Sequence, residues 1–342
     1  KALSAARKAS ELHTRYGGWA LVCGSAEGMG AAYAGRLARE GFDLVLLDMN
    51  APALDAQAKR LQAEFGIETR TLACDLSKPA LVSAALDALA DVEVGLLVFN
   101  AAIGAVGPWS EVSLATKMLA VNVNVIAVLM MTDRLSRPML ERGRGGIILT
   151  SSMAALQGAP GQAVYAATKS FDLILAESLW GELKDSGVDV LALIPGMVRT
   201  PNFKRSGADS GENMLLAAVE PEVAVDEALG ALGKEPRTVP GRGWKLAAAA
   251  SPLVPRRTMI ESIGKRMREL APDLEAHWFE AFGRVALTGE SRRFQNRAEA
   301  LHRFYDVYAF RFGAPEARQV AILFNDITAR KRAQALEAKL QE

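Results

Sequence analysis

The sequence predicts an α/β fold built on a doubly wound parallel sheet. Short apolar runs alternate with segments of helical length, which is typical of repeated βαβ units. Because the crossover between parallel strands must pass over one face of the sheet, helices are expected on both faces. The runs expected to form buried strands are 19–23, 44–48, 68–73, 95–100, 146–151 and 188–194.

The composition is that of an ordinary folded chain and excludes several classes of function. Of 342 residues, 40 are Lys or Arg and 39 are Asp or Glu, so the formal net charge of +1 gives no reason to expect nucleic acid as a partner. Two cysteines, Cys23 and Cys74, and three scattered histidines predict no metal site. No apolar run reaches the ~18 residues of a membrane span, so we expect a soluble, cytoplasmic protein.

The pattern changes beyond about residue 235, where a stretch rich in Pro and Gly indicates a domain edge. A basic helical segment follows over 256–270, and after Pro272 the pattern becomes helix, turn, strands and a final charged helix. We therefore expect a large domain over residues 1–262 and a smaller α+β segment over 263–342.

A glycine-rich turn lies between the first expected strand and the helix-forming run 31–40. Glycines let the backbone turn tightly, so that the amides of the helix N-terminus meet a pyrophosphate. A bare glycine motif is also compatible with a plain turn, and that alternative stays open. The position between strand and helix favours a dinucleotide site formed by Gly24, Ser25, Gly28, Met29, Gly30 and, at the end of the second strand, Asp48.

Asp48 indicates which dinucleotide is bound. Its carboxylate suits the ribose hydroxyls of adenosine but repels a 2′-phosphate, and Glu27 adds a second negative charge. NAD is therefore the expected cofactor, with NADP less favoured. The alternative is that Asp48 only caps the next helix, near Pro52.

Ser152, Tyr165 and Lys169 form the strongest candidate for a catalytic set. Tyr165 and Lys169 are four residues apart in Tyr-Ala-Ala-Thr-Lys, so on a helix they share a face and the ammonium lies beside the phenol. A positive neighbour favours the phenolate, which suits a tyrosine for acid/base catalysis. Ser152, at the end of the fifth strand, is expected to bond a substrate oxygen opposite the tyrosine. Taken singly, each residue also fits a purely structural role.

Over roughly residues 15–250 these motifs resemble those of the short-chain dehydrogenases/reductases, and segment 16–20 is similar to the hydroxysteroid and ketoacyl reductase branch. The resemblance implies a Rossmann-type, seven-stranded sheet, with Tyr165 as proton donor and acceptor and Lys169 as its ribose-binding partner. By the same resemblance, Ser152 orients the carbonyl and Asn122 helps to hold a proton-relay water. The further cofactor contacts that it implies are Asp75, Leu76, Asn100, Ala101, Ala102, Pro195, Gly196, Val198 and Thr200.

The tail, residues 271–342, resembles the C-terminal half of a PAS sensor domain. The resemblance rests on the segments 277–279, 287–290, 303–308 and 320–328. A half-domain exposes a strand edge, which favours pairing with another copy; together with the association common in the dehydrogenase family, this implies a homodimer or homotetramer. The alternative is a fusion remnant without a sensing role.

Two functions are compatible with these motifs. The first is a NAD(H)-dependent oxidoreductase that interconverts a secondary alcohol and a ketone, with Tyr165 moving the proton. The second is a regulatory protein that senses NAD(H) and signals through the PAS-like tail, although the intact catalytic set favours the enzyme. Apolar residues in 201–220, with Trp109 as a further wall, predict a hydrophobic substrate unless they pack into the protein's own core.

Overall fold

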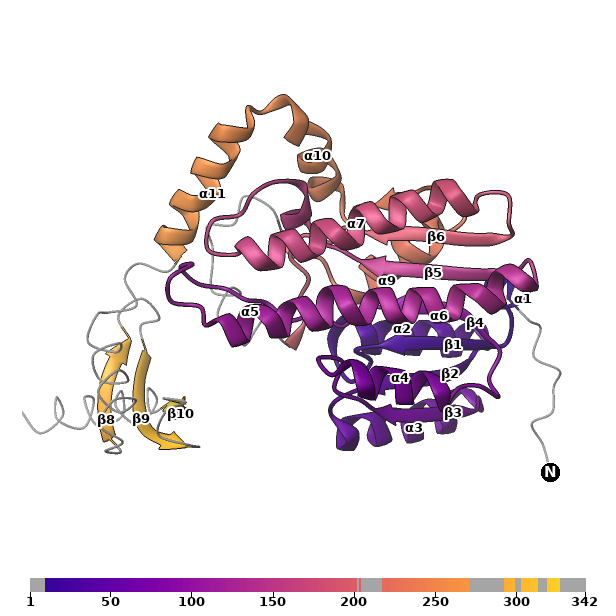
Figure 1. The fold of residues 1–342 in the computed structure, drawn as a ribbon, viewed down its shortest axis with the longest axis horizontal. Helices are drawn as coiled ribbons and strands as arrows, with labels where there is room; N and C mark the ends of the chain where they lie inside the picture. Colours follow the sequence, from indigo (N-terminus) through magenta and orange to yellow (C-terminus); the bar gives the residue numbers. More distant parts are fainter. Residues whose placement is uncertain are drawn as a thin grey trace, which may run out of the picture. The chain divides into compact units, whose positions relative to one another are not determined.

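The structure is a computed structural model that describes residues 10–201, 203, 217–270, 292–298, 303–312 and 319–326. The chain divides into two compact units, Lys1–Ile263 and Gly264–Glu342. The first unit contains the large parallel sheet, and the second contains a small antiparallel sheet (Figure 1).

A seven-stranded parallel sheet forms the centre of the first unit, which confirms the Rossmann-type prediction (Figure 1). Its strands are β1 (Trp19–Cys23), β2 (Asp43–Asp48), β3 (Thr69–Ala73), β4 (Val94–Phe99), β5 (Gly145–Thr150), β6 (Val188–Leu193) and β7 (Arg237–Thr238). The order β3-β2-β1-β4-β5-β6-β7 reverses the direction of winding between β1 and β4. β7 is short and pairs only with Ala192 and Leu193 of β6.

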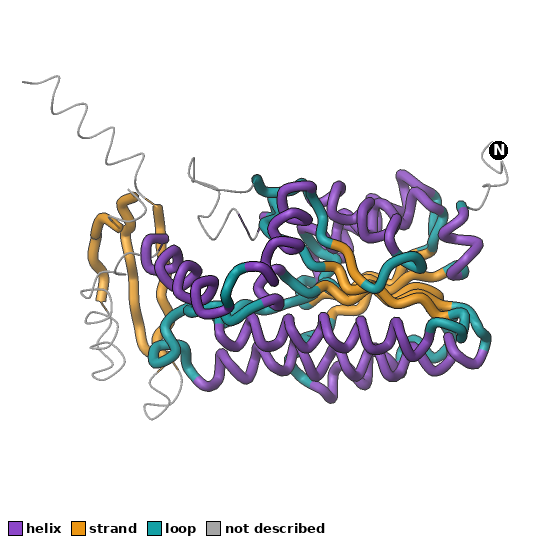
Figure 2. The backbone as a smooth tube through the Cα atoms, turned by 90° about the horizontal axis from the view of Figure 1, so that it is seen from above, coloured by secondary structure: helices purple, strands orange, loops and turns teal. Residues whose placement is uncertain are grey.

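Helices cover both faces of this sheet (Figure 2). On one face Leu37, Leu61 and Leu229 belong to one buried cluster, and on the other Leu86, Met131 and Leu173 belong to a second. The central strands bury side chains in both clusters, which explains their continuous apolar runs. The helices are α1 (Glu11–Tyr16), α2 (Gly28–Glu40), α3 (Ala51–Phe65), α4 (Pro79–Asp87), α5 (Leu114–Val121), α6 (Ala127–Glu141), α7 (Ala163–Leu183), α9 (Pro221–Ala231), α10 (Arg242–Ala250) and α11 (Arg256–Leu270).

One helical segment, Leu114–Glu141, joins α5, a π-helical turn at Asn122–Ile126 and α6. By length and composition alone it is apolar enough to cross a membrane, which differs from the expectation that no such run exists. Within the folded unit, Val128, Met131 and Leu135 on this segment are buried in the core. One face of this segment therefore packs against the core of the first unit.

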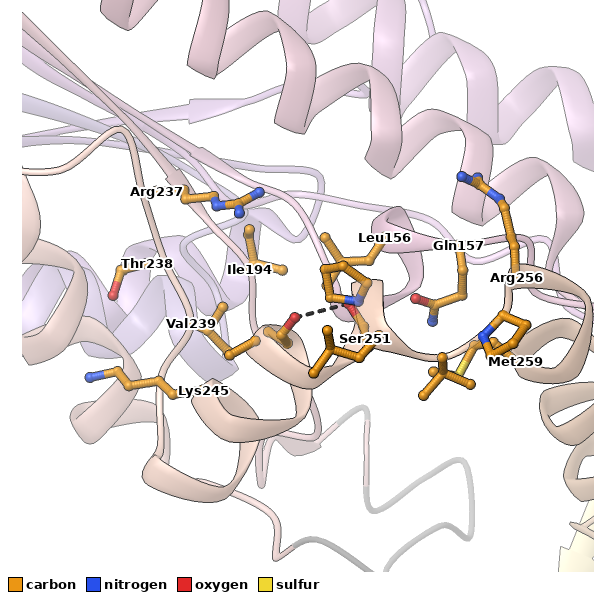
Figure 3. A pocket seen from close by; sticks show the side chains of 16 residues that line it. Leu156, Gln157, Ile194, Arg237, Thr238, Val239, Lys245, Ser251, Arg256 and Met259 are labelled. Carbon is orange, nitrogen blue, oxygen red and sulfur yellow. Dashed lines mark hydrogen bonds between the residues drawn. The ribbon is translucent and has the colours of Figure 1, made fainter.

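A cavity of about 800 Å³ lies beside the 3-10 turn η2 (Met153–Leu156) and the last two strands of the sheet (Figure 3). Its wall is completed by α10, by the short turn η4 (Ser251–Leu253) and by the beginning of α11. Apolar side chains such as Ile194 and Met259 line it, together with the cations Arg237, Lys245 and Arg256.

The second unit contains three antiparallel strands, β8 (Arg292–Ala298), β9 (Arg303–Phe312) and β10 (Gln319–Asp326), in the order β10-β9-β8. Arg293 of β8 donates two hydrogen bonds to Asp306 of β9, at 2.7 and 3.2 Å. Strands are therefore present in the tail where the pattern predicts them. The segments 277–279 and 287–290, the strand end at 327–328 and the expected final helix over 329–341 lie outside the described residues.

Candidate active site

The carboxyl ends of the parallel strands meet at one edge of the sheet, next to the reversal between β1 and β4. In open α/β sheets, ligands bind in the crevice at such a reversal. The residues predicted for cofactor binding and catalysis follow β1, β2, β3, β4, β5 and β6, or lie on the helices that begin there. The topology therefore brings them to the same edge.

The glycine loop between β1 and α2 has no room for a side chain at Gly24 or at Gly30. Gly24 has a φ of +78°, and a Cβ there would lie 2.8 Å from the Cα of Ala101. A Cβ on Gly30 would lie 1.8 Å from the carbonyl oxygen of Gly24, so only glycine lets α2 begin this close to β1. The loop therefore leaves the amides at the N-terminus of α2 open to an approaching pyrophosphate.

Two other residues of this loop face the protein. Ser25 is fully buried, and its Oγ donates to the carbonyl oxygen of Leu47 at 3.4 Å. Met29 packs against the apolar cluster that contains Leu37. The loop is thus anchored to β2 and to the core through these two residues.

Asp48 ends β2 beside the glycine loop. Its Oδ2 accepts a hydrogen bond from the amide of Ala26 at 3.1 Å, and its Oδ1 accepts one from the amide of Asn50 at 3.1 Å. The residue that caps α3 is Asn50, whose side chain accepts from the amide of Ala53. Capping of the next helix is therefore not the role of Asp48, whose carboxylate is instead fixed next to the loop.

Asn100 supplies a test of whether a dinucleotide fits this edge. Its amide donates to the carbonyl oxygen of Cys23 at 3.1 Å, which places it between β4 and the glycine loop. Its side-chain Oδ1 is buried and has no hydrogen-bond partner among the described residues. Since an unsatisfied buried acceptor is costly, a ribose hydroxyl donating to Oδ1 would satisfy it. Together with the glycine cradle and Asp48, this acceptor fits a dinucleotide.

The residues expected near adenine follow β3. The Asp75 carboxylate accepts hydrogen bonds from the hydroxyl and amide of Ser77 at 2.6 and 3.0 Å, and these bonds lower the pKa of Asp75. Leu76 is buried. Asn122, at the start of the π-helical turn, donates from Nδ2 to the Ser77 carbonyl oxygen at 3.1 Å. The structure thus ties Asn122 to the segment after β3, and the described hydrogen bonds of Lys169 go to other residues.

The segment after β6 folds back over the glycine loop. A Cβ on Gly28 would lie 3.0 Å from Cγ2 of Thr200, so these two residues are in close contact. Val198 pairs with Val219 in an isolated β-bridge, and a Cβ on Gly196 would lie 2.2 Å from Cδ2 of Trp244. The carbonyl oxygen of the remaining predicted residue, Pro195, accepts from the amide of Met153. Most of the expected cover, residue 202 and residues 204–216, lies outside the described residues.

Ser152 and Tyr165 lie on adjacent elements after β5. Ser152 caps η2 rather than ending β5, because the strand stops at Thr150. Its Oγ accepts from the amide of Ala154 at 3.2 Å, which leaves the hydroxyl proton available for donation. Tyr165 lies in the first turn of α7 and is half-buried. Both residues therefore follow β5 at the edge where the carboxyl ends of the strands meet.

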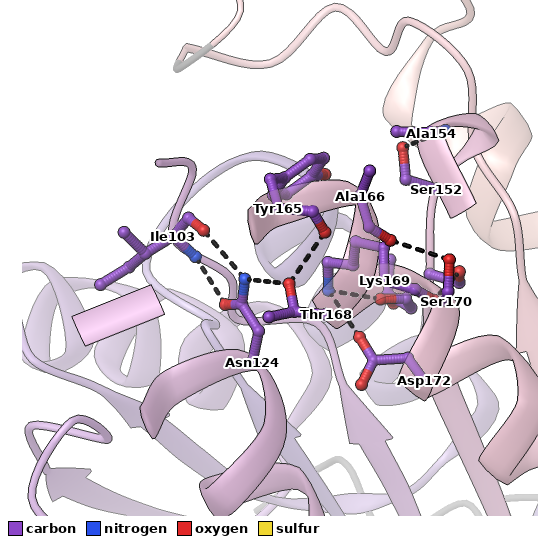
Figure 4. Close-up of polar contacts among 12 residues, drawn as sticks. Ile103, Asn124, Ser152, Ala154, Tyr165, Ala166, Thr168, Lys169, Ser170 and Asp172 are labelled. Atoms are coloured by element: carbon purple, nitrogen blue, oxygen red, sulfur yellow. Dashed lines mark hydrogen bonds and ion pairs between the residues drawn. The ribbon is translucent and has the colours of Figure 1, made fainter. Parts of the chain in front are cut away.

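Lys169 forms a buried ion pair that is not predicted from the sequence (Figure 4). Its Nζ donates to the carbonyl oxygen of Thr150 at 2.8 Å and to Oδ2 of Asp172 at 2.9 Å. Burial raises the pKa of Asp172 to about 6, against the opposing effect of Lys169. Tyr165 and Lys169 share α7 as expected, but no hydrogen bond joins these two residues in the described structure. A lone carboxylate inside the apolar run 171–176 is the signal that could have revealed the pair.

Asn124 is a second buried polar residue missing from the sequence prediction. Its Oδ1 accepts from the amide of Ile103 at 2.8 Å, and its Nδ2 donates to the Ile103 carbonyl oxygen and to Oγ1 of Thr168 at 2.9 and 3.0 Å (Figure 4). These bonds join the loop after β4 to the helical turn that carries Tyr165. An amide within the apolar run 120–128 is the corresponding sequence signal.

Two features lie apart from this set. Within the described part of the chain, Ser152, Tyr165 and Lys169 do not line the 800 Å³ cavity of Figure 3. Trp109, expected as a wall of the substrate site, is 67 % exposed, and the ammonium of Lys117 lies 3.7 Å from its ring centroid.

Comparison with known sequences supports the motif interpretation. The family model for short chain dehydrogenases matches residues 18–211. A 7beta-hydroxysteroid dehydrogenase of Collinsella aerofaciens is 29 % identical over 233 residues, which cover 68 % of this chain and 89 % of that protein. A very-long-chain 3-oxoacyl-CoA reductase-like protein of Arabidopsis thaliana is 33 % identical over 267 residues, which cover 75 % of this chain and 84 % of its own length.

Solved structures give the same result. A 7beta-hydroxysteroid dehydrogenase superposes with a TM-score of 0.71 at 27 % identity, covering 74 % of this chain and 99 % of that one. A short-chain dehydrogenase from Sphingobium yanoikuyae, solved with NADPH, has a TM-score of 0.62 at 30 % identity and covers 72 % of this chain and 95 % of its own. The family match ends at residue 211, so the PAS resemblance of the tail stays a prediction. Over more than half of its length the sequence matches the family model, and the chain belongs to the short chain dehydrogenase family.

Proposed function

We propose that the protein is an oxidoreductase that interconverts a secondary alcohol and a ketone with NAD(H). The observation that supports this most directly is the arrangement of Ser152, Tyr165 and Lys169 at the same sheet edge as the glycine loop. The names of the relatives, 7beta-hydroxysteroid dehydrogenase and 3-oxoacyl-CoA reductase, describe reactions of hydroxyl and keto groups.

In this proposal Tyr165 moves the proton. Its phenolate accepts the hydroxyl proton of the alcohol during oxidation, and its phenol returns a proton to the carbonyl oxygen during reduction. The hydroxyl of Ser152 donates a hydrogen bond to the same substrate oxygen and polarises it. The ammonium of Lys169 favours the phenolate through its positive charge. The nicotinamide supplies the hydride acceptor or donor when it is bound.

NAD is proposed as the preferred cofactor because a carboxylate stands at the end of β2. Asp48 accepts two backbone hydrogen bonds and is thereby fixed beside the glycine loop, so its charge would repel a 2′-phosphate there. Structural neighbours include one solved with NADPH and one with NAD, so the family accommodates both. The choice in this chain therefore depends on Asp48 itself.

A hydrophobic alcohol or ketone is proposed as the substrate. The relatives named for hydroxysteroids and very-long-chain acyl thioesters indicate large apolar substrates within this part of the family. The apolar residues Phe203, Met214, Leu215 and Leu216 in the segment 201–220 are those from which we expect the substrate wall.

A direct test is to follow NADH formation at the nicotinamide absorbance with a panel of secondary alcohols. The panel contains hydroxysteroids, 3-hydroxyacyl thioesters and small secondary alcohols, each assayed with NAD and with NADP. Turnover of at least one bulky alcohol, absent in Tyr165→Phe, is the expected result. Tight NADH binding without turnover of any panel member would instead indicate the sensing protein described above.

A further inference from the structure

The Lys169–Asp172 pair is the most deeply buried ion pair that the structure describes. The two residues are three positions apart on α7, and both side chains are 2 % exposed. Two of the three ammonium protons of Lys169 are used, one by Thr150 and one by Asp172. The second carboxylate oxygen of Asp172, Oδ1, is buried without a partner among the described residues. A carboxylate placed at such cost contacts the lysine of the proposed catalytic set.

Among the described elements that pack against α7, no other charged side chain is bonded to this pair. α7 packs against β5, β6, β7, α5, η2 and the π-helical turn. The ionisable side chains on these elements are bonded elsewhere: Asp189 to Tyr16 and Arg15, Arg237 to Glu177, and Lys117 to the Trp109 carbonyl oxygen. Asp172 is therefore the group that offsets the burial of the Lys169 ammonium.

We propose that Asp172 is a positioning residue that acts through Lys169, holding its ammonium in place and charged one helical turn from Tyr165. The proposal rests on the proposed function for the roles of Tyr165 and Lys169. Its physical basis is that an ammonium at this depth is strongly destabilised when its carboxylate partner is removed. Without Asp172, Lys169 gives up its proton or moves away, and Tyr165 loses its positive neighbour.

Two opposite shifts in the pH at which Tyr165 ionises distinguish the possible roles of Asp172. If Asp172 merely cancelled the lysine charge, its removal would strengthen the field at Tyr165 and the phenolate would form at lower pH. If Asp172 maintains the charge, its removal makes the phenolate form at higher pH. The burial of both side chains favours the second outcome, because desolvation of an unpaired ion outweighs its interaction with a more distant group.

The experiment is an ultraviolet titration of tyrosinate in the protein alone, without cofactor or substrate. The signal of Tyr165 is the difference between each protein and the same protein with Tyr165→Phe. This subtraction removes the absorbance of the other tyrosines, including Tyr305 and Tyr308. Burial also raises the pKa of Tyr16 and of Tyr33, so these two ionise at higher pH. In Asp172→Asn and Asp172→Leu we expect the Tyr165 midpoint to move upward by about one pH unit.

Asp189→Asn is the matched control. It also removes a carboxylate that bonds a buried group, the hydroxyl of Tyr16, but on β6 and away from Lys169. We expect no shift of the Tyr165 midpoint in this variant. In a Lys169→Met background, Asp172→Leu should likewise have no effect on that midpoint, since both partners of the pair are then gone. This double variant also keeps the test available if Asp172→Asn alone fails to fold, because an apolar pair often replaces a buried ion pair without loss of stability.

An unchanged midpoint in Asp172→Asn, or a downward shift, overturns the proposal. An upward shift that persists in the Lys169→Met background also overturns it, because Asp172 would then act without the lysine.

Once a substrate is known, the acid limb of the kcat profile for alcohol oxidation should show the same upward shift, with activity recovering at high pH. A purely structural defect would lower kcat equally at every pH. Failure of the protein to turn over any alcohol would reject the proposed function but would leave the titration result intact.

Discussion

The glycine loop and the first turns of α7 lie at the same edge of one sheet, but they are built in opposite ways. The loop depends on the absence of side chains, because a Cβ at Gly24 or Gly30 would collide with backbone atoms. The turns of α7 depend on buried polar side chains, of which Thr168, Lys169 and Asp172 each have a hydrogen-bond partner. One region is shaped by backbone packing, and the other by the pairing of functional groups.

This difference determines what a substitution does in each region. A change in the loop displaces the backbone and therefore removes the surface on which a cofactor would lie. A change on α7 leaves the backbone in place, because the helix is fixed by its apolar contacts, and alters the chemistry instead. The predictions below test this contrast.

The largest effect is expected for Tyr165→Phe on α7. Removing one hydroxyl deletes the proton-transfer group, so kcat should fall by ~10²–10⁴-fold. The affinity for NADH, measured by fluorescence titration, should stay close to that of the unmodified protein, because the ring remains. Near-normal turnover in this variant would remove Tyr165 from the mechanism.

For Gly30→Ala, in the glycine loop, we expect losses of stability and of NADH binding, both of which Tyr165→Phe should leave intact. The new Cβ would lie 1.8 Å from the Gly24 carbonyl oxygen, so the backbone must shift and stability should fall by about 1–3 kcal/mol. NADH binding should weaken together with stability, which urea denaturation and fluorescence titration measure separately.

Gly35→Ala on the same helix is the control for Gly30→Ala. The nearest atom to its Cβ would be the tip of Arg60 at 4.0 Å, so there is space for a methyl group. Alanine in a helix interior is favoured over glycine by ~0.5–1 kcal/mol, and we expect this variant to be at least as stable as the parent. Equal loss in both variants would contradict the close packing of α2 on β1.

The contrast also explains how much could be predicted from the sequence. The strands were located to within a residue or two, because a buried parallel strand has a continuous apolar run that is visible locally. The glycine loop was equally visible, since tight turns restrict residue type at each position. β7 had no such signal: it consists of two residues and exists only through pairing with the end of β6.

The side-chain partners on α7 were not predictable in the same way. The spacing of Tyr165 and Lys169 suggested that the ammonium points to the phenol, whereas its hydrogen bonds go to Thr150 and Asp172. Likewise, Asn124 meets Ile103 and Thr168 only because the fold brings three distant segments together. A sequence pattern places such residues on an element, but their partners depend on tertiary packing.

A smaller effect is expected for Asp48→Ala, at the boundary of the loop. If its carboxylate repels a 2′-phosphate, kcat/KM with NADP should rise and the preference for NAD should narrow by about tenfold. Asp91→Ala also removes a carboxylate, from an exposed pair with Arg70, and should leave the ratio unchanged. Equal use of both cofactors by the unmodified protein would mean that another residue sets the choice.

The smallest effect is expected in the pH dependence of thermal stability, through Asp172 on α7. An ordinary aspartate titrates near 3.8, and burial raises the pKa of Asp172 to about 6, so the folded protein binds this proton more tightly than the unfolded chain does, although Asp172 is still mostly ionised at neutral pH. The free energy of unfolding that the raised pKa contributes is complete below about pH 4. It is lost as the pH rises through 6, by on the order of 1–3 kcal/mol. At about 2–4 °C per kcal/mol, the Tm of the parent should fall by several degrees relative to Asp172→Asn between pH 4 and 7.

Asp133→Asn provides the comparison for this titration. Asp133 is exposed, and its hydrogen bond with Arg137 lowers the pKa of Asp133, so any contribution is lost as the pH falls rather than as it rises. Thermal denaturation at several pH values should therefore show the loss on the alkaline side only for the buried carboxylate. A parent curve parallel to that of Asp172→Asn would show that the pair does not titrate in this range. If the curves diverge as expected, Asp172 reduces stability at neutral pH, which is consistent with a buried ion pair that serves the site rather than the fold.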